Sequence, residues 1–365
     1  MTLNFEIEKP TPKNCSTNVN SYLEFTRCAI EMMKIKLIIY KNMLCIIHCK
    51  AINCCIFKLP NNKIHMHNIK TNFDKFLQLI TKNAKDLIME EGNFKFYPKK
   101  PKMSDCEILA LSLCSEAMSI DSENYFWGKI KSQSTDFPNL IDRSNYNRRR
   151  RNLIGFYNQL TQNLADQLNE GENIFIVDSM PLPVCNIARA NRSNVLREDF
   201  ETSPDKGYSA ITKTYFYGYK LHLITSLKGV YKSVDITKAS VHDIHYLDDV
   251  KQSSLNNCTL LGDKGYLSSE YKVDLFHTSK IELQTPKRRN QSDFSKYPYV
   301  FAKSRKRIET QFSQLADQFM IKRNYAKTFL GMCTRIWGKI AAFTLLQAIN
   351  HSNDKPLNQI KYALL

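Results

Sequence analysis

Three short segments, far apart in the chain, each place one acidic residue beside apolar residues that favour regular structure. The segments are IFIVDSMPLPVC, LLGDKGY and RKRIETQFSQL, and their acids are Asp178, Asp263 and Glu309. Asp178 and Asp263 each follow a short apolar run, which predicts strands that present both side chains at one edge of a sheet. Glu309 adjoins the apolar stripe of an amphipathic helix. Because dozens of residues separate the acids, only a folded α/β core can bring them together.

The same three carboxylates predict metal-dependent chemistry. Carboxylates in close contact repel one another unless a cation neutralises them. Mg²⁺ prefers one or two carboxylates together with water and phosphate oxygens, and Mn²⁺ would substitute for it. Two such ions in one site would activate an attacking oxygen and stabilise the leaving oxygen at phosphorus. We therefore predict Asp178, Asp263 and Glu309 as catalytic residues and metal ligands in phosphodiester chemistry.

Each of these residues also has an ordinary structural interpretation. An aspartate after a strand is often a turn former, and Glu309 among basic neighbours can be a surface ion pair. His222 and the His242–Asp243 pair are candidates for proton relay, but a strand histidine and a helix start are the ordinary interpretations. The combination of the three acids on one basic chain favours catalysis over these alternatives.

The charge of the chain favours a polyanionic partner. Its 365 residues include 52 Lys and Arg against 35 Asp and Glu, a formal net charge of +17. Such a field attracts nucleic acid, although an anionic membrane surface or solubility alone are alternatives. Basic residues are concentrated before and around Glu309, where they would follow a phosphate backbone. The predicted DNA-binding residues are Arg148, Arg149, Arg150, Arg151, Lys287, Arg288, Arg289, Arg305, Lys306 and Arg307.

Residues 66–170 have the apolar spacing of amphipathic helices. From Phe73 onward, apolar residues recur every three or four positions. Ser104 and Glu107 have the spacing of a capping box, and Asp121 or Ser122 is placed to begin a further helix. The arginines at 148–151 precede another apolar stripe, which predicts arginines at a helix start, as in helix-turn-helix DNA binders. A solvated charged face is the alternative for these arginines.

Residues 171–350 alternate between strand and helix patterns. The expected strands are 173–177, 215–225, 231–236, 259–262 and 281–285. The expected helices are 242–250, 268–277 and 304–322. SLKG joins the second and third strands and predicts a hairpin. The sequence therefore predicts an α/β fold with a mixed sheet flanked by helices, preceded by a helical DNA-binding region.

The first 65 residues differ from the rest of the chain. They hold six of the eleven cysteines, no glycine and no clear periodicity. We expect an atypical extension, disordered or spurious, with the functional protein starting near Met66. A zinc site built from these cysteines and nearby histidines is an alternative, but the spacing matches no standard finger.

The cysteines and the hydropathy pattern favour a cytoplasmic protein. An odd number of irregularly spaced cysteines does not resemble a disulfide framework. The opening residues lack the features of a secretory signal, and lysines interrupt the most apolar stretch, 35–59. No run approaches the ~20 apolar residues of a membrane helix, so no membrane partner is expected.

The chain resembles the DDE transposases of bacterial insertion sequences, and most of all the nine-eight-two type. The resemblance covers about 68–365 and is carried by an ordered set of motifs: MSDCEILALSLCSEA, VDSMPLPVCNIARA, YFYGYKLHLIT, ASVHD, GDKGY, LQTPKRRNQ, RKRIETQFSQLADQF and LNQIKYALL. It implies an RNase H-like catalytic core with Asp178, Asp263 and Glu309 as metal ligands. Related transposases often have a tyrosine and a lysine where this chain has Ala302 and Ala316, so Arg305 is the matched helper residue.

The resemblance also implies a function and a domain order. It implies binding of inverted-repeat ends in double-stranded DNA, cleavage there, and attack of the 3′-OH on target DNA, by a homodimer on paired ends in the bacterial nucleoid. A catalytically decayed or repurposed DNA-end-binding protein is the alternative, and a structure-specific nuclease with the same core is another. The expected domains are an extension at 1–65, a DNA-binding region at 66–170, a catalytic domain at 171–350 and a tail at 351–365.

Overall fold

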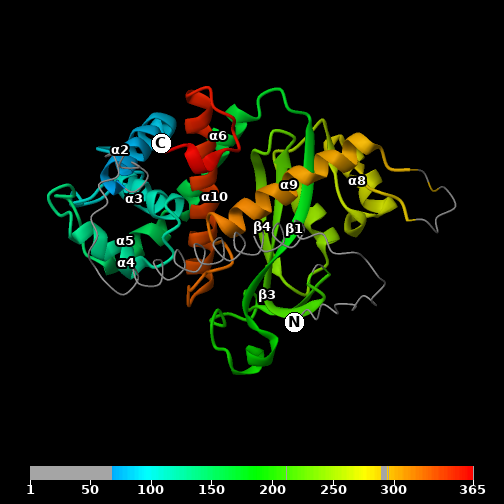
Figure 1. Ribbon diagram of the computed structural model, residues 1–365, viewed down its shortest axis with the longest axis horizontal. Coiled ribbons are helices and arrows are strands. Elements are labelled where there is room, and N and C mark those ends of the chain that lie inside the picture. The colour runs from blue at the N-terminus through cyan, green and yellow to red at the C-terminus, as the bar shows by residue number, and fades with distance from the viewer. Residues whose placement is uncertain (1–67, 211, 289–293, 295, 365) are drawn as a thin grey trace, which may run out of the picture. The chain divides into compact units, whose positions relative to one another are not determined.

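A computed structural model describes residues 68–364 except 211, 289–293 and 295 (Figure 1). The helices are α2 (Ile69–Asn83), α3 (Asp105–Ala117), α4 (Glu123–Lys131), α5 (Arg143–Asn152), α6 (Ile154–Leu168), α7 (Tyr246–Gln252), α8 (Ser269–Ser279), α9 (Tyr299–Asp317) and α10 (Phe329–Ser352). The strands are β1 (Ile174–Asn186), β2 (Asp205–Ser209), β3 (Thr214–Ser226), β4 (Tyr231–Lys238), β5 (Cys258–Leu261) and β6 (Ile281–Gln284). The expected extension at 1–65 and its alternative zinc site lie outside the described residues.

Helices α2 to α6 follow the local signals of the sequence. Ser104 accepts a hydrogen bond from the Glu107 backbone N–H, and the Glu107 side chain accepts one from Ser104 N, which confirms the capping box of α3. Ser122 caps α4 by accepting a hydrogen bond from Tyr125 N. The prediction of arginines at a helix start was wrong, because 148–151 form the last turns of α5. They end one helix, and α6 begins only after Leu153.

The strands form one mixed sheet in the order β2-β3-β1-β5-β6, with β4 paired to β3. The predicted hairpin is confirmed: β3 and β4 are antiparallel neighbours. β1 is antiparallel to β3 but parallel to β5, and β5 is parallel to β6. The predicted mixed sheet with flanking helices is thus present, with β2 as an additional edge strand.

Strand β1 is much longer than the sequence predicted. It was expected to end before Asp178, yet it continues to Asn186 along β3. Its pairing with β5 extends only to Ile176, so from Asp178 onward β1 has a single neighbouring strand. Pro181 and Pro183 lack the N–H group that a second neighbour would require, and prolines are tolerated at such an edge. Asp178 therefore lies inside a strand, at the point where the parallel pairing has stopped.

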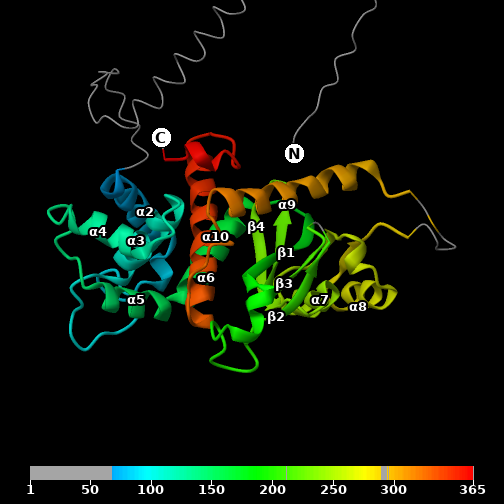
Figure 2. The same cartoon turned by 60° about the horizontal axis from the view of Figure 1, so that its bottom comes forward.

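The two faces of the sheet contact different helices. On β1, Phe175 and Val177 pack with residues of α7 and α8, whereas Ile176 and Met180 belong to the cluster that includes α9. Side chains alternate along a strand, so Asp178 shares the face of Ile176 and Met180. Figure 2 shows α9 crossing one side of the sheet while α7 and α8 lie on the other. Helix α9 begins earlier than expected and ends at Asp317, just before Met320 takes a left-handed φ of 49°.

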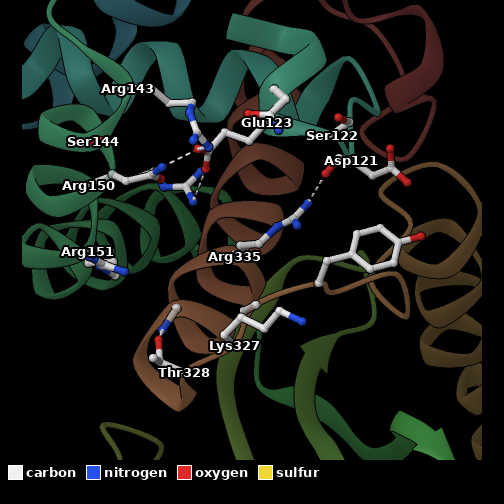
Figure 3. Close-up of a pocket in the computed structure, with 15 residues that line it drawn as sticks. Asp121, Ser122, Glu123, Arg143, Ser144, Arg150, Arg151, Lys327, Thr328 and Arg335 are labelled. Atoms are coloured by element: carbon white, nitrogen blue, oxygen red, sulfur yellow. Dashed lines mark hydrogen bonds and ion pairs between the residues drawn. The ribbon is translucent and has the colours of Figure 1, made fainter. Parts of the chain in front are cut away.

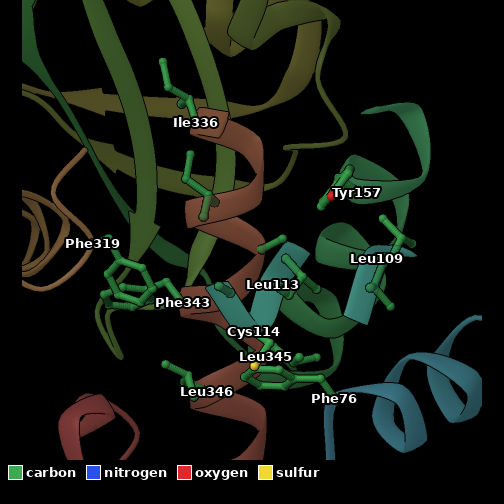
Figure 4. Packing of buried hydrophobic residues seen from close by; sticks show 14 of the residues in the cluster. Phe76, Leu109, Leu113, Cys114, Tyr157, Phe319, Ile336, Phe343, Leu345 and Leu346 are labelled. Carbon is green, nitrogen blue, oxygen red and sulfur yellow. The ribbon is translucent and has the colours of Figure 1, made fainter. Parts of the chain in front are cut away.

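Helix α10 was not predicted, and it connects the sheet region to the helical region. It packs against α6 and α3 (Figure 4), and it also contacts α5 and α9. Phe343 of α10 packs against Phe319 with tilted rings whose centroids are 5.5 Å apart. Among the described residues, α10 is the helix long and apolar enough to span a membrane, but 67% of its most apolar window is buried inside the protein. Its apolar composition is that of a core helix.

Candidate active site on the α9 face of the sheet

Asp178 is held at the α9 face by its own strand and by Arg305. Its Oδ1 accepts a hydrogen bond from Ser179 N at 2.8 Å. Nη2 of Arg305, which extends from α9, lies 3.8 Å from Asp178 Oδ2. Both side chains are about one fifth exposed, each 21%. The carboxylate is thus partly shielded from water but still accessible.

Asp263 lies beside Asp178 because of the parallel register. Ile176 of β1 pairs with Leu261 of β5, and each aspartate follows two residues later, Asp178 within β1 and Asp263 just past the end of β5. Asp263 Oδ1 accepts a hydrogen bond from Gly265 N at 2.7 Å, which begins a single helical turn at 264–266. The register therefore brings two of the three predicted acids to one place.

The pKa of Asp178 reflects this proximity. Burial raises it to about 6, and repulsion from Asp263 and Asp243 acts in the same direction. The hydrogen bond from Ser179 and the charge of Arg305 lower it only in part. A pair of carboxylates that repel each other in a partly desolvated site is a donor set that suits a divalent cation.

The structure does not bring Glu309 into contact with the two aspartates. Glu309 is exposed on α9, one turn after Arg305, and has no ion-pair partner within the described residues. In the part of the chain that is described, no three His, Cys, Asp or Glu side chains are grouped closely enough to hold a metal ion. The role of Glu309 as third metal ligand stays a prediction.

Lys220 and Asp243 border the site and form a pair that the sequence did not indicate. Lys220 Nζ lies 2.9 Å from Asp243 Oδ1 and donates a hydrogen bond to Val241 O. Oδ2 of Asp243 is 3.9 Å from the position that a Cβ on Gly265 would take, so the pair adjoins the Asp263 turn. Lys220 comes from β3, the strand next to β1, and only its register reveals it.

His222 has a structural role in this arrangement. It is fully buried, its Nε2 lies 2.8 Å from Thr237 Oγ1, and its ring stacks on Tyr246. Burial lowers its pKa to about 4, so the ring is neutral at physiological pH. This is the ordinary strand histidine, and we assign it no part in proton transfer.

The comparison with known families fits this geometry. Residues 169–345 match the family model described as the transposase DDE domain, a span that contains Asp178, Asp263, Arg305 and Glu309. This part of the chain is a transposase DDE domain. No curated protein and no solved structure matches the chain. The family acts on DNA in transposition and recombination, and its members form a metal-dependent class of nucleases and strand transferases.

The predicted DNA-binding residues fall into distinct environments around the DDE domain. Arg149 pairs with Asp105 at 2.5 Å, and the buried Arg150 approaches Glu123 at 3.5 Å. Both arginines are thus engaged in ion pairs with acidic residues, and their role in DNA binding stays a prediction. Arg148 is exposed and Arg151 is half-buried.

The remaining basic residues lie on α9 and in the segment before it. Lys306 and Arg307 are exposed on α9, near Arg305. Lys287 is half-buried and Arg288 exposed, and both have interaction partners. Arg289 lies outside the described residues. Lys306 and Arg307 therefore face solvent on the same helix that carries Arg305.

We expect the metal-free DDE domain to be stabilised when Asp178 is replaced by asparagine. The pKa of this carboxyl is about 6 in the folded protein against 3.8 for the free group, so folding disfavours its charged form. The wild-type protein should lose stability as pH rises from about 4 to about 6, and Asp178→Asn should gain ~1–3 kcal/mol above that window. Urea unfolding in a chelating buffer across this pH range measures the difference. If Asp178→Asn kept the same gain in the free energy of unfolding below pH ~4, the gain could not come from the raised pKa of Asp178.

Proposed function

We propose that the chain is the transposase of a bacterial insertion sequence. It binds the inverted-repeat ends of the element, cleaves a strand at each end by metal-dependent hydrolysis, and joins the 3′-OH to target DNA. We also propose that its mixed sheet is RNase H-like and that residues 66–170 recognise the ends. The observation that carries the proposal is the pair Asp178 and Asp263, placed together beside Arg305 within a transposase DDE domain.

The residues at the α9 face fit a divalent-metal centre. Asp178 and Asp263 supply hard oxygen donors that repel each other without a cation, and Glu309 is the third donor of the proposal. Two Mg²⁺ ions, with Mn²⁺ as a substitute, supply activation of the attacking oxygen and charge stabilisation at the leaving oxygen when bound. Ser179 N and Gly265 N fix one oxygen of each aspartate, which leaves the other oxygens for ligation.

Arg305 has a positioning role in the proposal. Its guanidinium faces Asp178 at 3.8 Å, longer than a direct hydrogen bond, and its Nε is buried without a partner among the described residues. A scissile phosphate at the α9 face would offer this arginine a second anionic partner. Lys306 and Arg307 extend the positive charge along the exposed side of α9, where a DNA strand would approach.

A direct assay tests the function. Labelled duplexes from the DNA that flanks the reading frame, with short inverted repeats, are incubated with purified protein and Mn²⁺ or Mg²⁺. The proposal expects nicks at the repeat boundary and joined products when target DNA is present. A shift in mobility without cleavage would favour the decayed or repurposed end binder, and cleavage that ignores the repeat would favour a structure-specific nuclease.

The assembly is part of the same proposal. Joining two ends requires two catalytic centres, so we propose a homodimer on paired ends. Light scattering with and without the end duplex would measure the change in mass. A single protomer on two ends would contradict it.

A further inference from the structure

A cavity of about 660 Å³ lies away from the two aspartates, in the helical region (Figure 3). Its walls come from the start of α4, from α5, from the segment just before α10, and from the first turns of α10. Nothing in the proposed chemistry uses it. Residues that are distant in sequence, such as Arg151 and Lys327, meet there because α10 packs against α5 and α6.

The cavity is positively charged. Its basic lining residues are Arg143, Arg150, Arg151, Lys327 and Arg335, against the acidic Asp121 and Glu123. Glu123 is shared by Arg143 at 3.2 Å and Arg150 at 3.5 Å, so one carboxylate serves two guanidinium groups. Figure 3 shows these three side chains converging on one wall. The acids therefore compensate only part of the positive charge.

Two of the cations have no ion-pair partner among the residues that the structure describes. Arg151 is half-buried at the end of α5, and Lys327 is exposed just before α10. The backbone of Lys327 is fixed, because its carbonyl accepts a hydrogen bond from Leu196 N at 3.1 Å. The first turn of α10 is already capped by Thr328 and by Glu198, so the cations available to a ligand are the side chains of Arg151 and Lys327 and not the helix terminus.

The rim adds an aromatic side chain. Tyr325 lines the cavity and is 66% exposed, so its ring is accessible to a ligand in the cavity. Aromatic rings beside free cations are typical of surfaces that hold a nucleic-acid backbone and the sugar or base attached to it. An acidic protein surface could form ion pairs with these cations, but it would offer no base or sugar to contact the ring of Tyr325.

We propose that this cavity is a DNA-backbone subsite in which Arg151 and Lys327 bind phosphodiester oxygens and Tyr325 contacts the adjoining nucleotide. The inference rests on the proposed function in that the ligand is DNA. It goes beyond that function by assigning Lys327, Tyr325 and the start of α10 to DNA binding. It also explains how an arginine from the end of α5 can act on DNA while Arg149 and Arg150 are engaged inside the protein.

The test uses the full chain and fluorescence anisotropy with a labelled duplex, titrated at several salt concentrations. Arg151→Gln with Lys327→Gln should weaken binding about tenfold to a hundredfold and lower the salt slope by about 1 to 2. Because phosphate contacts do not read sequence, end-containing and scrambled duplexes should lose affinity equally. The charge-retaining pair Arg151→Lys with Lys327→Arg should bind much more tightly than the glutamine pair.

A matched control removes the same charge elsewhere. Lys82 on α2 and Lys272 on α8 are exposed and do not line the cavity, so Lys82→Gln with Lys272→Gln should change the slope little. Equal losses in the control and cavity variants would overturn the inference, because the effect would then be net charge alone. The duplex is bound without metal, so the result does not depend on cleavage. Failure of cleavage with intact cavity effects would count against the proposed function only.

Discussion

Replacing Asp178 with asparagine is expected to reduce cleavage of an end-containing duplex on the order of a thousandfold or more while DNA binding persists. Asparagine has nearly the same shape but removes the negative charge that a divalent cation requires. Its side chain can still accept the hydrogen bond from Ser179 N, so the strand geometry should be kept. Cleavage in a gel assay with Mg²⁺, and binding by anisotropy, measure the two effects separately.

The other two acids extend this experiment. Asp263→Asn should have the same consequence, because the register places it beside Asp178. Glu309→Gln tests the residue that the structure leaves apart from the pair. Asp248→Asn is a matched control, since Asp248 is an aspartate of α7 that pairs with Lys251. Cleavage at the wild-type rate in Asp178→Asn would remove the catalytic assignment, and wild-type cleavage in Glu309→Gln alone would remove only the third ligand.

Replacing Lys339 with methionine is expected to lower the free energy of unfolding by about 3–5 kcal/mol. Lys339 of α10 forms an ion pair with Glu116 of α3, and their side chains are only 1% and 3% exposed. Without the lysine, Glu116 is left in the core with Arg335 at 3.9 Å as its remaining partner. Urea unfolding monitored by circular dichroism measures the change.

A double replacement separates the cost of an orphaned charge from the value of the pair. Glu116→Met with Lys339→Met should be much less destabilising than Lys339→Met alone, because both charges leave the core together. The exposed pair Lys100 and Glu91, 2.8 Å apart, provides a control in which Lys100→Met has little effect. A double variant that loses as much stability as Lys339→Met alone, or more, would show that the orphaned charge of Glu116 is not the source of the loss.

Elements with strong local signals could be predicted from the sequence. The capping box at Ser104 and the serine before α4 gave the starts of two helices, because caps depend on residues within one turn. The hairpin of β3 and β4 followed from alternation on both sides of a short turn. These features arise from neighbours in sequence, where pattern and structure are directly connected.

Features that depend on distant neighbours could not be predicted in this way. The apolar run at 173–177 predicted that β1 ends before Asp178, but the strand continues through Pro181 and Pro183 because one of its edges has no partner there. The four arginines at 148–151 looked equivalent, yet Asp105 and Glu123 engage two of them. Helix α10 lacks the polar face of an amphipathic helix because neighbours cover most sides of it.

The candidate site also combines features that local sequence predicts with features that depend on distant residues. Asp178 and Asp263 were predicted as neighbours from the apolar runs before them, and the register of β1 and β5 brings them together. Lys220 was missed because only the pairing of β3 with β1 reveals that it adjoins Asp243 and the Asp263 turn. Glu309 depends on how α9 is placed over the sheet, which no local pattern determines.

Helix α10 limits how this protein could be taken apart or recombined. The family match ends at residue 345, inside α10, yet α3 and α6 cover much of that helix. A fragment that begins at residue 169 would keep the strands but lose α3 and α6. The apolar surface of α10 would then be exposed, and the fragment would be expected to aggregate. Exchange of residues 66–170, the proposed end-recognition region, between relatives would therefore require matching changes in α10, because both regions pack on that helix.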